Sequence, residues 1–267
     1  MNRAYFTHVW RANRWRLAIV AIALAAWGAL LPIVFDAFGA QFQALIDSGI
    51  IPSQFARFGG GDIFSLAGSV ALGFVHPIAV GLALVFSVGF AAAAIAGERE
   101  RGTLEVLLAR PVSRRRVYAT ALAASMLFAA VTMGALTLGA LAGSAVVGRL
   151  AELGPANLPV VWLNATLLFC AFGAISLGAS VSFDRLTPAI GTSLAIVLVS
   201  YFLDVIAELW PAAAFLQPYS LFHYLDARAG LSGFANPGDM VVLIGVTGVA
   251  IAYALVVFPQ RDLAAPA

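Results

Sequence analysis

Six long apolar runs dominate the sequence and limit what it can fold into. A helix needs about 20 mostly apolar residues to cross the hydrocarbon core of a bilayer. Lipid offers no partner for backbone N–H and C=O groups, so each run must satisfy them itself as a helix. We expect an all-α membrane protein with six transmembrane helices in a single domain, residues 1–267. The runs cover about residues 17–36, 70–96, 117–147, 160–183, 186–206 and 240–258.

Composition agrees with the bilayer as the solvent and excludes several functions. Hydrophobic residues make up 62% of the chain, too many for a soluble globule with a polar surface. All 15 basic residues are arginine, so the phosphate-binding lysine of a P-loop is missing and any ATP must be hydrolysed by another chain. The net charge is only +2, and no basic soluble face indicates nucleic-acid binding. The single cysteine, Cys170, lies in an apolar run and predicts neither an intrachain disulfide nor a cysteine metal site.

The arginines mark one side of the predicted bundle. Cytoplasmic loops of membrane proteins retain arginine and lysine, so the distribution predicts orientation. Arginines precede the first run, crowd the loop 97–116, and follow the fourth and last runs. Of the 15 arginines, only Arg57, Arg149 and Arg228 fall on the opposite side. We therefore expect both termini and the 97–116 loop in the cytoplasm.

Two stretches outside the runs are also rich in aromatic residues. Residues 1–16 mix tyrosine, phenylalanine and tryptophan with arginine, which is typical of an amphipathic helix in the inner headgroup layer. A simple positive-inside anchor explains the same residues equally well. Residues 207–239 carry aromatic and leucine side chains interrupted by Pro211 and Pro218, which favours short re-entrant helices in the outer leaflet before the last span. Anchoring by an aromatic belt is the alternative there.

The loop between the second and third runs concentrates charge. Nine of its twenty residues, Gly97 to Arg116, are charged, against 10% of the whole chain. Thr103 can cap a short helix, with Glu105 in the first turn where the helix dipole favours an anion. Pro111 ends this element. We expect a two-turn cytoplasmic helix here, followed by Ser113 as the cap of the third span.

One face of this short helix is apolar, because Leu104, Leu107 and Leu108 recur at spacings of three and four. A helix of two turns is unstable alone in water and needs a surface to pack on. A loop that only sets topology would need the arginines but not the leucines, nor the glutamates on the basic side. We therefore favour a helix that docks on a partner protein.

The segment Glu98 to Arg114, ERERGTLEVLLARPVSR, resembles the coupling segment of the membrane subunits of type-two ABC exporters. In that family an acidic and basic run, Gly-Thr-Leu, a Leu-Leu pair and Pro-Val-Ser-Arg follow the second span. Phe258 and Arg261-Asp262 at the end of the last run are further similarities. Ala119-Thr120 stands where relatives commonly carry Gly-Lys. The resemblance extends over the whole six-span plan.

This resemblance implies the permease subunit of an ATP-driven exporter in a prokaryotic plasma membrane. Two permease copies, expected to be identical, would pair with two separate ATPase subunits that carry the ATP and magnesium, so the chain itself needs no cofactor, metal or catalytic residue. The few charges within the runs favour a hydrophobic or amphipathic cargo. The residues expected to contact the ATPase are Glu98, Glu100, Gly102, Thr103, Leu104, Leu107, Leu108, Pro111 and Arg114.

Other motifs carry less information. His76-Pro77 predicts a kink near the outer end of span two. Gly139 and Gly143 form one GxxxG step, which permits close helix packing but also arises by chance in a chain with 25 glycines. The alternative function is a membrane-embedded enzyme, or a sensor that transports nothing, in which the basic loop is only a topology signal.

Overall fold

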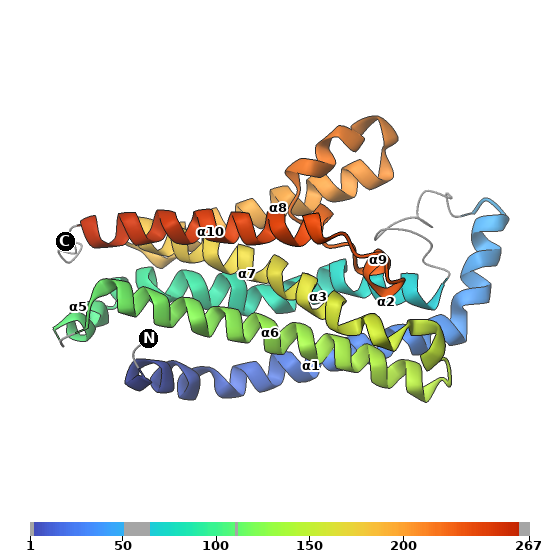
Figure 1. Cartoon of the computed structure of the whole chain (residues 1–267), viewed down its shortest axis with the longest axis horizontal. Helices are drawn as coiled ribbons and strands as arrows, with labels where there is room; N and C mark the ends of the chain where they lie inside the picture. The colour runs from blue at the N-terminus through green and yellow to red at the C-terminus, as the bar shows by residue number, and fades with distance from the viewer. Residues whose placement is uncertain (1–2, 51–64, 110–111, 262–267) are drawn as a thin grey trace.

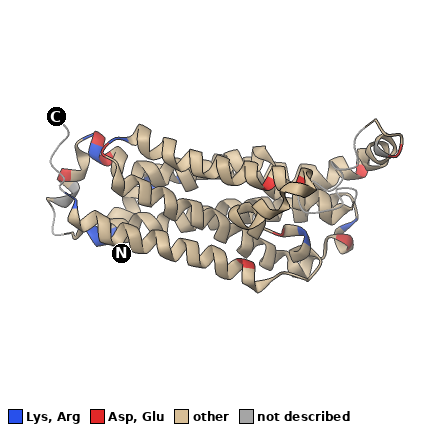
Figure 2. Cartoon of the chain, turned by 90° about the horizontal axis from the view of Figure 1, so that it is seen from above, with Lys and Arg blue, Asp and Glu red and all other residues tan. Residues whose placement is uncertain are grey.

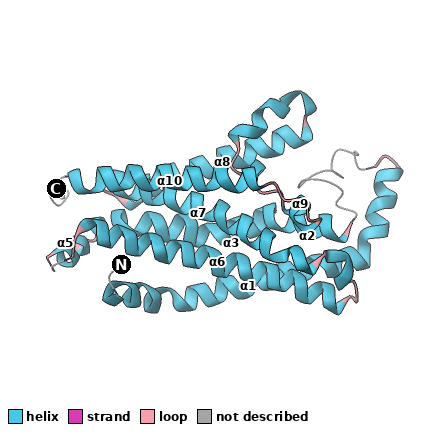
Figure 3. Ribbon diagram, in the orientation of Figure 1, coloured by secondary structure: helices cyan, strands magenta, loops and turns pink. Residues whose placement is uncertain are grey.

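The structure is a computed structural model that describes residues 3–50, 65–109 and 112–261, without the side chains of Ile46, Leu107 and Leu108. Within these ranges every regular element is a helix (Figure 3). Five helices are individually long and apolar enough to cross a membrane, and a sixth crossing results if one bent pair counts as a single span. The predicted six-span plan is therefore confirmed. The long helices are α1 (Arg3–Asp47), α6 (Arg114–Val146), α7 (Leu158–Ser182), α8 (Leu186–Leu209) and α10 (Pro237–Gln260).

The bent pair forms the second span. Helix α2 (Leu66–Val75) and the helical stretch that starts at Pro77 with α3 (Pro77–Leu84) meet at an angle of 41°. Pro77 has no N–H to donate, and His76 adopts an extended backbone at the junction. The His76 side chain caps the new helix, since its Nδ1 accepts the Ile78 N–H at 3.3 Å. The predicted kink is confirmed, with the histidine in a structural role.

Helix α1 is continuous from Arg3 to Asp47. Residues 3–16 were expected to form an interfacial helix or a simple anchor, and they instead continue the first span without a break. Among their apolar side chains Val9 is buried, while Trp10 and Trp15 are 37% and 70% exposed. Trp10 stacks on Phe128 of α6 with 6.3 Å between ring centroids. Residues 3–16 are therefore not a helix separate from the first span, and their depth in a membrane stays a prediction.

Helices α1 and α6 lie side by side along the bundle and approach closely through glycines (Figure 1). A Cβ added to Gly139 would lie 2.0 Å from the Ala25 carbonyl oxygen, and one added to Gly143 would lie 2.3 Å from that of Ala29. From the opposite side, a Cβ on Gly28 would lie 2.2 Å from the Leu136 carbonyl oxygen. The GxxxG step, which sequence could not separate from chance, is thus a site of backbone contact.

Charge collects toward the two ends of the bundle, and most of the length between them is uncharged (Figure 2). The Arg3 end of α1 and the Gln260 end of α10 lie at the same end as the short helix α5 (Thr103–Leu108) (Figure 1). Six crossings return the chain to the side where it started. The arrangement agrees with the expectation that the charged loop and both ends of the chain share one side.

The stretch before the last span contains three short helices, η6 (Pro211–Tyr219), η7 (Phe222–Tyr224) and α9 (Ala227–Leu231). Helix η6 and the end of α8 form a hairpin that projects from the bundle (Figure 1), where Trp210, Phe215 and Tyr219 are exposed. The later part packs inward, with Phe222 and Leu231 buried. The predicted short helices are present, and their depth in a membrane stays a prediction.

Candidate functional site

The charged loop begins at the inner end of span two with α4 (Glu98–Glu100), followed by a sharp turn at Gly102. Gly102 has φ +69°, a left-handed conformation that favours glycine, and it is the residue that precedes α5. The Thr103 hydroxyl donates to the Glu98 side chain and to the Glu98 carbonyl oxygen. The prediction that Thr103 caps α5 is therefore wrong, because its hydroxyl points back to α4 and the tight turn requires glycine at the cap position.

Helix α5 packs its Leu104 inward. This side chain is only 1% exposed and lies in a cluster with Tyr118 of α6, Leu177 of α7 and Phe258 of α10. Leu104 was expected to offer apolar contact to a partner, and its contacts are instead made within this chain. The side chain that faces outward is Val106, 67% exposed. Pro111 and the side chains of Leu107 and Leu108 lie outside the described residues.

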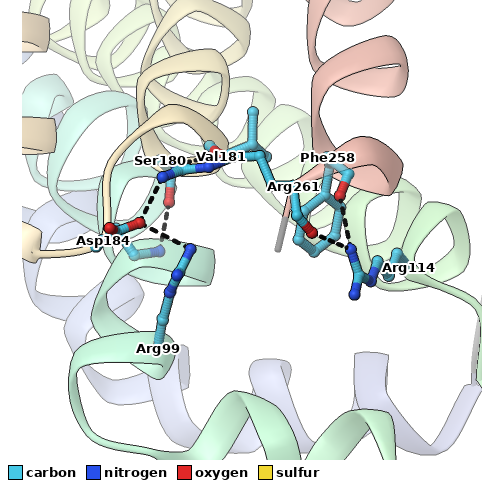
Figure 4. Close-up of polar contacts among 8 residues, drawn as sticks. Arg99, Arg114, Ser180, Val181, Asp184, Phe258 and Arg261 are labelled. Atoms are coloured by element: carbon cyan, nitrogen blue, oxygen red, sulfur yellow. Dashed lines mark hydrogen bonds and ion pairs between the residues drawn. The ribbon is translucent and has the colours of Figure 1, made fainter. Parts of the chain in front are cut away.

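Asp184, in the turn between α7 and α8, contacts two arginines from different parts of the chain (Figure 4). Its Oδ1 lies 2.7 Å from Arg99 Nη1 of the loop and 2.5 Å from Arg261 Nη2 at the end of α10. Arg261 also donates from Nη1 to the Val181 carbonyl oxygen at 2.9 Å. The Arg99 side chain is 10% exposed, so this ion pair is shielded from water on the arginine side.

Arg114 holds the end of α10 from the other side of the loop. Its Nη1 donates to the carbonyl oxygens of Phe258 and Pro259 at 3.3 Å and of Arg261 at 2.6 Å (Figure 4). A guanidinium at these last carbonyls is favoured by the helix dipole and satisfies acceptors that a helix end leaves open. Arg114, expected to face a partner, is thus engaged within the chain.

Glu100, Ser113 and Glu98 make further contacts at the loop, with α8, with the start of α6 and within the loop itself. Glu100 Oε2 accepts the Leu186 N–H at 2.9 Å, at the start of α8, where an anion meets the positive end of the helix dipole. Ser113 caps α6 as predicted, since its Oγ accepts the Arg116 N–H. Glu98 pairs with Arg101 at 2.5 Å in addition to its contact with Thr103. The loop is therefore bound to three places at the same end of the bundle: the start of α8, the turn at Asp184 and the end of α10.

Sequence reasoning missed Asp184. The signal available was a single acidic residue in a short connection on the arginine-rich side, next to Arg185. Its two partners, Arg99 and Arg261, are 85 and 77 positions away, and no local pattern relates positions that far apart. The contact depends on which helices become neighbours.

Replacing Asp184 with alanine is expected to destabilise this end of the bundle by about 1–3 kcal/mol. Breaking a buried ion pair costs about 3–5 kcal/mol, and the figure is reduced here because Asp184 is 45% exposed. Unfolding midpoints in mixed detergent measure the change. Asp36→Ala is the control, because Asp36 forms an exposed pair with Arg149 at 3.6 Å. Equal midpoints for the two variants would contradict a special role of Asp184.

No group of three His, Cys, Asp or Glu side chains in the described part of the chain could hold a metal ion. An apolar hollow of about 520 Å³ lies between α6 and α7, lined by Gly134, Leu138 and Trp162 among others. The Trp162 indole N–H already donates to the Ala130 carbonyl oxygen at 2.9 Å, so the hollow offers hydrophobic surface only.

Comparison with known families agrees with this picture of a membrane-embedded helical bundle. The family model described as ABC-2 family transporter protein matches residues 18–263, which is most of the chain. A search of the curated proteins finds no match. The residues matched by the family model include all six spans, apart from the first part of α1, and the charged loop with Asp184 and Arg261. The chain therefore belongs to the ABC-2 family of transporter proteins, as a multi-pass membrane protein with a transport permease role.

Proposed function

We propose that this chain is the permease subunit of an ATP-driven exporter and that the outward side of α4 and α5 docks on a separate ATPase subunit. One observation carries the proposal. A short helix with an exposed apolar side chain, Val106, places its buried Leu104 in an apolar cluster with residues of α6, α7 and α10. A force applied to such an element moves several spans together. Membership of the ABC-2 family supports an ATPase as the source of that force.

The docking surface that we propose differs from the one expected from sequence. Leu104 and Arg114 hold the segment to this chain, and Glu98 and Glu100 set its shape and its contact with α8. The exposed residues Arg101, Glu105 and Val106 are left to meet the ATPase. Gly102 remains important because it aims α5. ATP and magnesium belong to the partner in this proposal.

The proposal includes orientation, assembly and cargo. Arginine-rich loops are retained in the cytoplasm, so we place the end that carries α5 and both chain termini there, in a prokaryotic plasma membrane. Two identical permease copies with two ATPases form the simplest closed assembly. The long uncharged middle of the bundle favours a hydrophobic or amphipathic cargo over a bare ion (Figure 2).

Val106→Asp is expected to reduce the ATPase retained per permease at least about tenfold in co-purification from membranes. Burying a new carboxylate in an apolar contact costs more than the 1.4 kcal/mol that corresponds to a tenfold change in affinity. Position 106 is exposed in this chain, so insertion and folding are expected to be unchanged. The yield of monodisperse protein checks this.

Val146→Asp is the matched control, because Val146 is also an exposed helical valine but ends α6 at the opposite end of the bundle. The control is expected to retain the ATPase at the wild-type level. If the wild-type permease retains no ATPase in several detergents and nucleotide states, docking is refuted. The loop then becomes a topology signal, and the sensor and enzyme alternatives gain weight.

A further inference from the structure

The inner half of span two departs from regular α-helix directly before the charged loop. It contains two π-helical stretches, η2 (Val85–Phe90) and η3 (Ala93–Gly97), and the second leads straight into α4. The Ala91 N–H donates to the Phe86 carbonyl oxygen, five positions back, where an α-helix would use the residue four back. Such π-bulges are rare and occur frequently at functional sites. Each π-helical stretch rotates the residues that follow it about the helix axis, relative to a regular α-helix.

A side chain from another helix accompanies the second π-helical stretch. The Ser180 hydroxyl of α7 accepts the N–H of Ile95 at 3.1 Å and that of Ala96 at 2.9 Å. It also donates to the Ala92 carbonyl oxygen at 2.6 Å. In a regular α-helix the Ala96 N–H would donate to the Ala92 carbonyl oxygen itself. The hydroxyl of Ser180 is inserted between these two groups and uses its one donor and both acceptor positions.

The turn that follows α7 contacts the start of the loop. Helix α7 ends at Ser182, and Asp184 in the turn after it pairs with Arg99 of α4. In Figure 4 Ser180 and Asp184 lie next to each other beside the turn that carries Arg99. The end of α7 and the turn after it therefore contact this part of the chain twice, at the backbone of η3 through Ser180 and at the Arg99 side chain through Asp184.

We propose that Ser180 is a positioning residue that sets the rotational phase of α4 and α5 by holding span two in its π-helical form. Without the inserted hydroxyl, the N–H of Ala96 is free to bond to the Ala92 carbonyl oxygen, and η3 relaxes toward α-helix. A change of one residue in phase rotates the following segment by about 100° and shifts it by about 1.5 Å along the axis. Each Cα then moves by roughly 3.5 Å, given the helix radius. The significance for transport rests on the proposed function, because the phase decides which side of α5 meets the ATPase.

Pulsed electron–electron double resonance on the full chain in lipid nanodiscs reports this rotation as a change in the distance between two spin labels. Spin labels are attached at Val106→Cys on α5 and Leu198→Cys on α8, both exposed positions, in a background with the buried Cys170 changed to alanine. Ser180→Ala is expected to shift the mean distance between the labels by roughly 3 Å or more. Ser180→Thr keeps a hydroxyl and is expected to preserve the wild-type distance.

Ser176→Ala is the matched control. Ser176 lies one turn before Ser180, is equally buried, and donates only to the Phe172 carbonyl oxygen of its own helix. It is expected to leave the distance unchanged. The proposal is overturned if Ser180→Ala keeps the wild-type distance, if Ser176→Ala shifts it as much, or if Ser180→Thr shifts it despite its hydroxyl. If the alanine variant does not fold, a shifted distance in Ser180→Thr still overturns the proposal.

A second arm separates this proposal from ATPase docking. This arm uses chains without a label at position 106, because Val106 belongs to the proposed docking surface. If the permease binds the ATPase, Ser180→Ala is expected to lose at least half of the ATPase retained in co-purification, while Ser176→Ala keeps it. The distances without ATPase do not depend on docking at all. A wild-type chain that binds no ATPase but shows the Ser180 shift would refute the proposed function and leave the positioning role standing.

Discussion

Gly139→Leu is expected to separate α1 from α6 and to lower the melting temperature of the purified protein by roughly 6 °C or more. Any Cβ at position 139 would lie 2.0 Å from the Ala25 carbonyl oxygen, and a backbone atom cannot rotate away as a side chain does. Overpacking of this kind costs about 3 kcal/mol or more. For a chain of this size about 1 kcal/mol corresponds to a shift of 2–4 °C.

The comparison for Gly139→Leu is Gly248→Leu in α10. Nothing lies within 4 Å of a Cβ at Gly248, so the same substitution there meets open space. Its melting temperature is expected to stay within about 2 °C of wild type, since surface substitutions usually change stability by less than about 0.5 kcal/mol. Fluorescence-detected size exclusion after heating measures both variants. Equal melting temperatures would show that α1 and α6 do not pack through their backbones.

Leu104→Asp is expected to release α5 from the bundle and to speed trypsin cleavage after Arg101 at least about tenfold. Changing a buried leucine to alanine lowers folding stability by about 2–5 kcal/mol. A carboxylate adds the cost of burying a charge among Tyr118, Leu177 and Phe258. Local opening is then favoured, and the cleavage rate follows the population of the open form.

Val106→Asp is the control for this experiment as well. The two positions are two residues apart on one short helix, but Leu104 is buried and Val106 is exposed. Val106→Asp is expected to keep the wild-type cleavage rate while losing the ATPase, and Leu104→Asp to lose both. If cleavage in Leu104→Asp stays at the wild-type rate, α5 does not depend on its contact with the core. The pair of variants thus separates anchoring from docking.

Together these contacts describe how a push on α5 could reach the membrane spans. Leu104 passes it to α6, α7 and α10 by packing, and Glu100 and Asp184 pass it to the connection between α7 and α8 by hydrogen bonds and ion pairs. Ser180 fixes the rotation of span two where it leaves the bundle. The described part of the loop is therefore held to the bundle end through several contacts, while Arg101, Glu105 and Val106 are exposed.

Much of the fold could be predicted from sequence, because its causes are local. Runs of about 20 apolar residues have to become helices in lipid, and a proline after an extended residue bends the second of them. The charged loop could also be found, since arginine, glycine and proline at Gly97 to Arg116 interrupt the apolar pattern. The cap at Ser113 follows from the same local chemistry.

Most differences from expectation concern which neighbour a side chain meets. Leu104 was expected to face a partner because a two-turn helix needs a surface to pack on, and Arg114 because the family resemblance implies it. Leu104 packs on Phe258 and its neighbours, and Arg114 bonds the carbonyls of residues 144 to 147 positions away. Thr103 was a good cap by type, but Gly102 takes that place because the turn needs positive φ. Residues 3–16 were expected to form a helix separate from the first span, and they continue α1 instead.

Local composition was therefore enough to predict the number of spans, the position of the loop and the shared side of both chain ends. Each of these depends on hydropathy and charge along a short stretch. The ion pairs at Asp184, the glycine contacts of α1 with α6 and the insertion of Ser180 depend on side chains that are far apart in the chain. They exist only after the helices have packed, because a hydrogen bond or a backbone contact requires atoms within a few ångströms, and that proximity comes from the assembled bundle.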